Sequence, residues 1–484
     1  MLFTYAYFYQ AGDWGQNVRF NLVRAILQKH TLTIDAYHAN SGDKAGFRGH
    51  FYLDKPPGTS FTALPFVAAT NGVLRVVGID PESNRGVVAG SYVASLTASS
   101  VPALLAALAV WWVALAFGAS MGGALFAAGV FALGSPMFTY ATVLWSYGLA
   151  GGGLIAAFAA AVALRHVGST RRDFGLGAMV GACAGWATVS ELACAPAAIL
   201  LTVLVGLHVG KGRRLRVAAG LALGALATGG IWMSYNLAAF GNLLSVGYDH
   251  IDEGQFSLQA SGGAIFGIVG PRLTVLWQIL FGHEYGLFIL APVLLAAPVG
   301  LGMLVRAPAD RKAGIIAVMI VGWFVFLNSS LVFWSGGGNY GPRHIAPALP
   351  FLCLGLAPVW TWATRPVKLA LGAVALVGVV FAFVTVATAA VPEEDDILGP
   401  VPQAMDHFVR GELSINVNAY YYEEEVWVWP RTVEQQAALT RNAWNLGELV
   451  GLRGLPSLLP LLLAWIAGIV TWRRWSKQAP AAVV

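Results

Sequence analysis

The stretch that decides the fold runs from Asp13 to Pro57 and reads DWGQNVRFNLVRAILQKHTLTIDAYHANSGDKAGFRGHFYLDKPP. It is a polar island in a strongly apolar chain, and most of the remaining sequence has the pattern of membrane helix. Ionisable groups are rare inside membrane proteins and concentrate where substrates, ions or protons are handled. The island is therefore the first place to look for chemistry. Its ionisable residues include Asp13, Arg19, Asp35, Asp43, Lys44, Arg48, His50, Asp54 and Lys55.

Composition indicates a polytopic membrane protein. The 484 residues are 57% hydrophobic and 11% charged, with a mean hydropathy of +0.66, whereas soluble domains are about 25% charged. The net charge of +5 does not favour nucleic-acid binding, because the basic residues stand in short loops, where they orient helices in a bilayer. The three cysteines lie inside apolar runs without a CxxC pair, which favours a packing role.

Apolar runs predict an all-α protein with about twelve transmembrane helices. Residues 1–11 have the pattern of the outer end of a first membrane helix and lack the features of a cleavable signal peptide. The later runs span residues 88–116, 121–137, 145–165, 174–189, 193–209, 215–234, 283–305, 313–333, 344–361, 367–391 and 456–472.

Basic clusters orient these helices. Alternate crossing puts all of the clusters on one side, which is the cytoplasm by the positive-inside rule. The parity holds only if the apolar run 58–79 stays on the outer face as a juxtamembrane or re-entrant helix. The clusters are Arg165 to Arg172, Lys211 to Arg216, Arg306 to Lys312, Arg365 to Lys368 and Arg473 to Lys477.

We expect three parts in the chain. A transmembrane module covers residues 1–391 and carries an outer loop at 12–87. An extracytoplasmic cap comes next at 392–455, and a last membrane helix with a cytoplasmic tail occupies 456–484. In the outer loop, Val18, Leu22 and Ile26 recur at helical spacing. They predict an amphipathic helix that lies along the bilayer interface or, equally well, is an ordinary surface helix.

Polar turns converge on the predicted outer face. A carboxylate beside cations there would suit sugar transfer from a lipid phosphate, because the acceptor hydroxyl needs a general base and the leaving phosphate needs Lys or Arg. Singly, each turn has a structural alternative, such as a local Asp54–Lys55 ion pair. The turns hold Asp13; Asp43 in GDKA; Asp54 and Lys55 in YLDKPPG; Tyr248, Asp249 and His250; His283 and Glu284; and Tyr340, Arg343 and His344 in WSGGGNYGPRH.

The order of these motifs resembles the C-type glycosyltransferase superfamily of polytopic membrane enzymes. The resemblance is to bacterial members related to protein O-mannosyltransferases and lipid A aminoarabinose transferases. It covers the layout of residues 1–391 and rests on short motifs, YLDKPPG and GPRHIAPALPFL. It implies a polyprenyl-phosphate sugar as donor and a carboxylate of the first outer loop as base.

Carried over to this chain, the resemblance implies roles for individual residues. Lys55 matches the lysine of the family's KPP motif, so Lys55, Arg343 and His344 are expected to bind the donor phosphate. The remaining substrate contacts are expected from Arg19, His50, Asp54, Tyr248 and Tyr340.

The catalytic acid departs from the family pattern. In better-known relatives it opens a motif Asp-Glu-x-x-Tyr, whereas the matching stretch here is QNVRF, with Gln16 in place of the Asp. Asp13, one helical turn earlier, and Asp43 are the substitutes, in that order.

The resulting hypothesis is an inverting glycosyltransferase of the bacterial inner membrane. It would act at the extracytoplasmic face on an acceptor that is a protein, a lipid or a glycan. The rival is an inactive glycosyltransferase-like subunit or assembly factor of a larger membrane complex, since Gln16 replaces the usual acid. The absence of paired similar halves disfavours a secondary transporter.

Two features stay open at the level of sequence. No metal cluster is evident, and a divalent metal, required by some members of the superfamily, would find its ligands in Asp249 with His250 or in the acids 423–425. Glu191, in VSELAC between two apolar runs, marks either a short outer turn or a buried polar contact.

Overall fold

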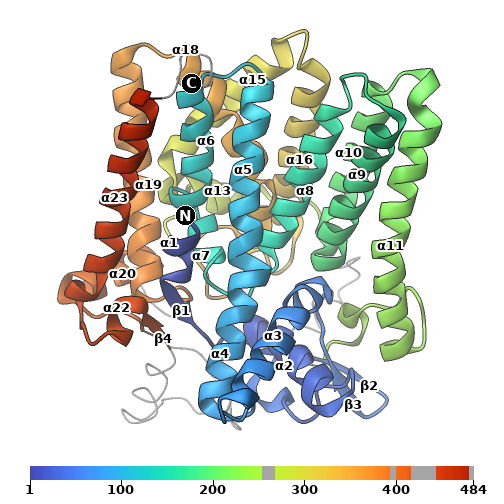
Figure 1. The fold of residues 1–484 in the computed structure, drawn as a ribbon, viewed down its shortest axis with the longest axis vertical. Coiled ribbons are helices and arrows are strands. Elements are labelled where there is room, and N and C mark those ends of the chain that lie inside the picture. Colours follow the sequence, from blue (N-terminus) through green and yellow to red (C-terminus); the bar gives the residue numbers. More distant parts are fainter. Residues whose placement is uncertain (253–266, 393–398, 416–442, 479–484) are drawn as a thin grey trace.

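The computed structural model describes residues 1–252, 267–392, 399–415 and 443–478. Its helices run roughly parallel to one another in a bundle, and shorter elements gather below them (Figure 1). We call this lower end the site end. It holds α2 (Trp14–Arg24), β2 (Ala45–Phe47), β3 (His50–Tyr52) and α3 (Gly58–Val76).

The bundle is built from eleven long helices and several short ones among the described residues. The long ones are α4 (Asn84–Ser95), α5 (Val101–Ala116), α6 (Met121–Leu133), α8 (Tyr147–Ala163), α9 (Thr170–Ser190), α10 (Ala195–His208), α11 (Arg214–Phe240), α15 (Ala297–Arg306), α16 (Arg311–Ser330), α19 (Arg365–Thr388) and α23 (Leu459–Gln478). The other described helices are α1 (Leu2–Ala6), α7 (Met137–Tyr140), α13 (Leu273–Phe281), α14 (Leu287–Leu290), α17 (Leu349–Leu354), α18 (Leu356–Trp362), α20 (Pro400–Arg410) and α22 (Leu446–Leu449).

The helices bear out a membrane protein but not the predicted count of twelve spans. Within the described ranges, five segments are long and apolar enough to cross a bilayer, and five shorter apolar helices accompany them; all ten fall on predicted runs. Neither α3 nor α9 is among these candidates. Helix α3 lies at the site end, as expected if the basic loops between alternating helices all lie on one side. The five long segments are Asn84–Ala116, Lys211–Phe240, Arg311–Ser330, Arg343–Trp362 and Arg365–Thr388.

Basic loops gather at the end of the bundle opposite to the site end. Arg165 bonds Asp310 at 2.8 Å, and Arg213 and Arg216 both bond the buried Asp173 at 2.5 and 2.8 Å. These pairs join the loops after α8, α10 and α15. The structure therefore confirms that these predicted basic clusters share one end, which we call the basic end.

Helices α9 and α11 approach one another through small residues. A Cβ atom on Gly181 would collide with the carbonyl of Leu221, and one on Gly224 with the carbonyl of Ala178. In a bilayer, such close backbone approach replaces the hydrophobic drive that holds soluble helices together. Gly229, also on α11, faces open space instead.

We expect Gly224→Ala to destabilise the protein by about 1–3 kcal/mol, because overpacking forces the two backbones apart. The matched control is Gly229→Ala on the same helix, where alanine meets nothing and stabilises the helix by up to about 1 kcal/mol. Melting temperatures in detergent measure both changes. Equal melting temperatures for the two variants would contradict the packing described.

The chain near its first residues differs from the expectation of a continuous helix end. Helix α1 ends at Ala6, and Phe8–Gln10 forms strand β1, which pairs antiparallel with β4 (Ala443–Asn445). The Gln10 side-chain amide donates to the carbonyls of Thr388 and Ile415 at 2.8 and 3.0 Å. An unforeseen sheet thus ties the chain start to the predicted cap. The cap's acidic and aromatic runs at 393–396 and 420–430 lie outside the described residues.

Helix α2 is present where the apolar spacing predicts it, but it is not an interfacial helix with a wet polar face. Residues 15–24 are all buried, and their polar side chains bind protein groups. Asn17 donates to the carbonyl of Asn40 at 2.7 Å, and Arg24 pairs with Glu82 at 3.1 Å. Both partners belong to the outer loop that precedes α4.

Candidate active site

Asp13 begins helix α2 and faces the bundle. Its carboxylate caps the helix by accepting the backbone N–H of Gln16 at 2.8 Å. The indole N–H of Trp145 donates to both carboxylate oxygens, at 3.1 and 3.4 Å. Burial raises the pKa of Asp13 above its ordinary value, although the capping bond and the charge of Arg19 act in the opposite direction.

A second pair of carboxylates shares one lysine. The Lys55 ammonium lies 2.6 Å from the Asp54 carboxylate and 3.0 Å from that of Asp43. All three are largely buried, with Asp54 only 3% exposed. The YLDKPPG motif therefore forms the local ion pair that was its structural alternative, and the GDKA turn completes it.

The two carboxylates titrate in opposite directions. Burial and the neighbouring Asp43 raise the pKa of Asp54, in spite of Lys55. Burial alone would raise the pKa of Asp43 too, but Lys55, with Arg343 and Arg19 beyond it, holds that pKa below its ordinary value. Asp43 is therefore the ionised partner of Lys55 at neutral pH.

Arg343 is a cation without a carboxylate partner among the described residues. Its guanidinium carbon lies 5.7 Å from the centre of the Trp145 ring, and its Nε is buried with no hydrogen-bond partner. Gly336, with φ of +77°, passes so close to this side chain that a Cβ atom would strike Nε. The guanidinium interacts electrostatically with Asp13 and Asp43.

Arg19 and Tyr248 complete what we call the charged cluster: Asp13, Arg19, Asp43, Asp54, Lys55, Tyr248 and Arg343. Arg19 is 5% exposed and donates to the carbonyl of Gly15 at 2.6 Å. The Tyr248 ring centre lies 5.9 Å from the Lys55 ammonium. Its neighbour Gly247 packs directly on the backbone of Asp54, which holds the two turns together.

Three predicted site residues lie at the margin of this cluster or apart from it. His344 comes directly after Arg343, and its Nε2 is buried without a hydrogen-bond partner. His50, by contrast, stands on the β2–β3 hairpin, 55% exposed, and bonds Asp35 at 2.7 Å. Tyr340 packs in an apolar group with Leu290 and Val384.

The remaining polar turns serve local structure. Asp249 accepts the backbone N–H of Val246 at 3.0 Å, and His250 bonds Ser245 at 2.8 Å. His283 and Glu284 are exposed and lie 3.6 Å apart. Within the described ranges, no three His, Cys, Asp or Glu side chains group as metal ligands, and the acids 423–425 fall outside those ranges.

Two residues that the sequence analysis did not assign to the site, Trp145 and Glu191, contact it in the structure. Trp145 carries no ionisable group and stood inside an apolar run, so only its position reveals its contacts. Glu191 lies at the end of α9, where Ser146 donates to it at 2.9 Å. It also interacts electrostatically with Tyr248, and Gly58 of the KPPG motif packs on the preceding Ser190. In the sequence, the position of Glu191 between two apolar runs was the feature that could have indicated its place at the site.

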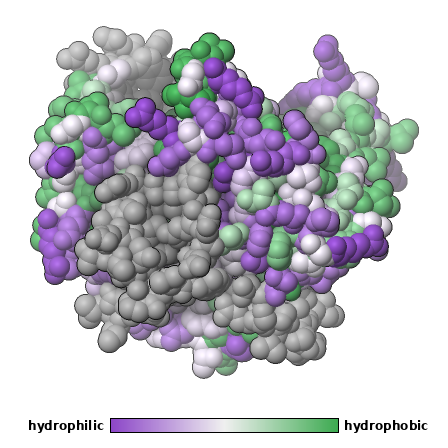
Figure 2. Space-filling model, turned by 90° about the horizontal axis from the view of Figure 1, so that it is seen from below, coloured by the Kyte–Doolittle hydropathy of each residue, from purple (hydrophilic) through white to green (hydrophobic). Residues whose placement is uncertain are grey.

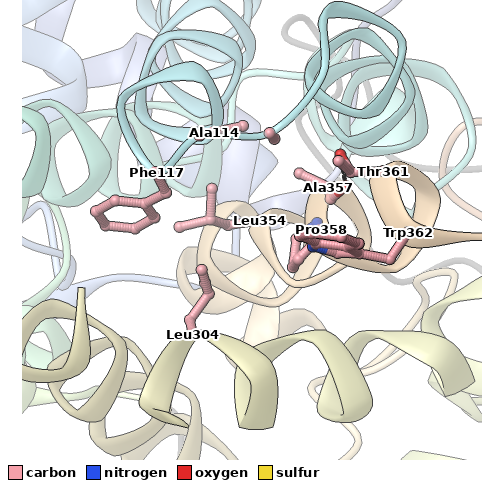
Figure 3. A pocket seen from close by; sticks show the side chains of 10 residues that line it. Ala114, Phe117, Leu304, Leu354, Ala357, Pro358, Thr361 and Trp362 are labelled. Atoms are coloured by element: carbon pink, nitrogen blue, oxygen red, sulfur yellow. Dashed lines mark hydrogen bonds between the residues drawn. The ribbon is translucent and has the colours of Figure 1, made fainter. Parts of the chain in front are cut away.

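Seen from the site end, the described part of the surface carries many hydrophilic residues (Figure 2). A small cavity of about 30 Å³ lies elsewhere, at the basic end, between α5, α15 and α18 (Figure 3). Apolar side chains such as Phe117, Leu304 and Leu354 line it. It has room for one or two waters and is far too small for a sugar.

Comparison with known proteins gives the fold. No family model matches the sequence, and no curated protein does. Among solved structures, the chain is similar to ArnT from Cupriavidus metallidurans bound to undecaprenyl phosphate, with a TM-score of 0.51 at 17% identity. ArnT is a lipid A aminoarabinose transferase.

The chain shares the fold of this ArnT, which is a C-type glycosyltransferase. The match covers 76% of this chain and 60% of that ArnT chain, so the protein corresponds to about three fifths of its length. The apo state of the same ArnT matches with a TM-score of 0.48 at 14% identity, over 76% of this chain and 59% of that one. The resemblance noted in the motifs thus extends to the arrangement of the helices.

Asp43→Asn tests the ion pairs. We expect it to lower the free energy of unfolding at pH 7 by about 1.5–3 kcal/mol, the range for a hydrogen bond to a charged group. Because the folded-state pKa of Asp43 is lowered, this stabilisation is present above the unfolded value of about 3.9 and is lost as the pH falls through the folded value. Detergent melting curves of wild type and variant should converge below about pH 4.

Asp54→Asn is the matched control for this experiment. The pKa of Asp54 is raised whereas that of Asp43 is lowered, so the folded protein favours the ionised form of Asp54 less than that of Asp43. We expect a smaller loss at pH 7 than for Asp43→Asn. An equal or larger loss would reverse the assignment of the two acids.

Proposed function

We propose that the protein is a membrane glycosyltransferase that moves a sugar from a polyprenyl-phosphate donor to an acceptor hydroxyl. The observation that carries the proposal is the pair formed by Arg343, a cation without a carboxylate partner among the described residues, and Asp13, an acid held by an indole and a helix cap, both in contact with Trp145. The C-type fold and the undecaprenyl phosphate bound to ArnT support a lipid-linked donor.

Arg343 is the main phosphate ligand in this proposal. Its planar guanidinium offers two parallel N–H groups to phosphate oxygens. Lys55 is the second cation, but two carboxylates already neutralise it, so it contributes to the field at the site more than to a direct bond. His344, next to Arg343, lies at the edge of the charged cluster.

Asp13 is the preferred general base. A base works best when its pKa approaches the working pH, and burial moves the pKa of Asp13 in that direction. Asp43 is held ionised by Lys55 and is correspondingly a weaker base. Gln16, at the position of the usual acid, instead accepts the backbone N–H of Leu144 at 2.9 Å and fixes the turn before Trp145.

The step is a single displacement with inversion. The acceptor oxygen attacks the anomeric carbon while its proton passes to Asp13. The bond from the anomeric carbon to the phosphate oxygen breaks, and its electron pair stays on the polyprenyl phosphate. Arg343 stabilises the charge that this phosphate gains.

The membrane placement is inferred from charge. The basic loops lie at the end opposite to the charged cluster, so the positive-inside rule puts the cluster at the extracytoplasmic face of the inner membrane. We propose that residues 1–391 form the catalytic module, that 392–455 cap its outer face, and that 456–484 supply a last span and tail.

Arg343→Ala is expected to weaken binding of undecaprenyl phosphate about 10- to 100-fold, since one charged hydrogen-bonding group is lost. Native mass spectrometry of the detergent-solubilised protein with undecaprenyl phosphate measures this. Arg85→Ala, an exposed arginine at the start of α4, is the matched control and should leave binding unchanged. Equal binding by wild type and Arg343→Ala would reject the phosphate site.

Asp13→Asn is expected to lower the rate of sugar transfer about 10²- to 10⁴-fold while lipid binding persists, because the variant cannot accept a proton. The assay measures release of undecaprenyl phosphate from its glucose, mannose and galactose conjugates, with native membranes as the source of acceptors. Asp43→Asn should retain more activity than Asp13→Asn. A wild type that transfers no sugar and copurifies in fixed stoichiometry with a larger complex would favour the inactive-subunit alternative instead.

A further inference from the structure

Trp145 contacts both of the residues on which the proposed chemistry depends. It stands in the turn between α7 and α8 and is 3% exposed. Its indole N–H donates to the two oxygens of Asp13 at 3.1 and 3.4 Å, while its ring centre lies 5.7 Å from the guanidinium carbon of Arg343. One side chain therefore touches a carboxylate with its edge and lies within cation–π distance of a cation.

The ring is fixed by its surroundings. Tyr140 and Tyr147 pack against it, with ring centres 5.5 and 5.9 Å away. The Trp145 carbonyl accepts the hydroxyl of Ser99 at 2.9 Å, and the preceding backbone N–H is held by Gln16. The position of the ring is therefore set from several elements, as a precise site requires of its supporting residues.

These contacts have a property that an ion pair would lack. A carboxylate against Arg343 would neutralise the guanidinium, and a lysine against Asp13 would neutralise the carboxylate, as happens in the Asp43–Lys55–Asp54 group. An indole orients both groups through its N–H edge and its ring face without forming an ion pair with either. The charges stay available for a phosphate and a proton.

We propose that Trp145 is a positioning residue that holds Asp13 and Arg343 at a fixed separation and keeps them from neutralising one another. This inference rests on the proposed function, in which Asp13 is the base and Arg343 binds the donor phosphate. In this proposal, the Trp145 ring sets the distance between the acceptor hydroxyl and the leaving phosphate.

The test is the pH dependence of transfer by Trp145→Phe, which keeps an aromatic ring near Arg343 but lacks the N–H donor. An N–H bond to a carboxylate favours its ionised form. Without the bond, the acidic limb of the pH–rate profile should move to higher pH by about 0.5–1 unit. Transfer is measured by release of undecaprenyl phosphate from its glucose, mannose and galactose conjugates.

Trp186→Phe is the matched control. The Trp186 indole also donates a part-buried hydrogen bond, at 2.9 Å, but to Thr62 of α3 instead of to an acid. It loses the same atoms and should leave the pH profile in place. Comparable melting temperatures of the two variants, and retained binding of undecaprenyl phosphate by Trp145→Phe, verify that the site is folded.

A second variant separates the two contacts. Trp145→Leu removes the ring as well as the N–H, so it should also weaken binding of undecaprenyl phosphate several-fold, whereas Trp145→Phe should not. In the Asp13→Asn background, Trp145→Phe should cause no further loss of transfer, because the two changes act on one interaction.

The outcomes separate this inference from the proposed function. An active wild type whose pH profile is unchanged in Trp145→Phe, or additive effects of Trp145→Phe and Asp13→Asn, would overturn the role of Trp145 alone. A wild type that transfers none of the three sugars and binds undecaprenyl phosphate independently of Arg343 would overturn both.

Discussion

Charge compensation at one end of an apolar helix bundle is the constraint on which the rest of this structure depends. An ionised side chain left alone in such surroundings is destabilised by several kcal/mol, whereas a well-paired one is tolerated. Lys55 satisfies two carboxylates at once, and Arg24 satisfies Glu82, so the outer loop can fold onto the bundle as a polar layer. Asp13 and Arg343 are held instead by an indole, a helix cap and a close glycine, none of which cancels their charge. Among the described residues, neither Asp13 nor Arg343 forms an ion pair, so the two have the properties of a proton acceptor and of an anion ligand.

The fold shared with ArnT at 17% identity shows how little sequence such an arrangement requires. Helix packing relies on small residues at contact points, as between α9 and α11, and apolar residues elsewhere can interchange. A fold of this kind hosts different chemistries, so the function of this chain depends on its site residues and not on its helices. In the proposed function, Asp13 acts in place of the usual acid because Gln16 stands at that acid's position, and such a change is compatible with an unchanged fold.

The sequence by itself determined the membrane class, the positions of most apolar helices, the gathering of basic loops at one end and the polar stretch that holds most of the candidate site. These features depend on hydropathy and on charge in short loops, which are properties of local segments. The sequence also placed Asp13, Asp43, Asp54, Lys55 and Arg343 in one candidate set, because the turns that carry them fall on the same side when the helices alternate.

Only the tertiary structure decided how those groups pair. Whether Lys55 faces Asp43 or a ligand, and whether Arg343 meets a carboxylate or the ring of Trp145, depends on ångström-scale distances between turns far apart in the chain. The same holds for β1, which becomes a strand because β4 lies beside it, for His50 and Tyr340, which engage other partners, and for Glu191, which joins the site through Ser146. The spacing of apolar residues along the sequence does not predict such distances. It indicates which face of a segment is apolar, but not which residues that face contacts in the folded protein.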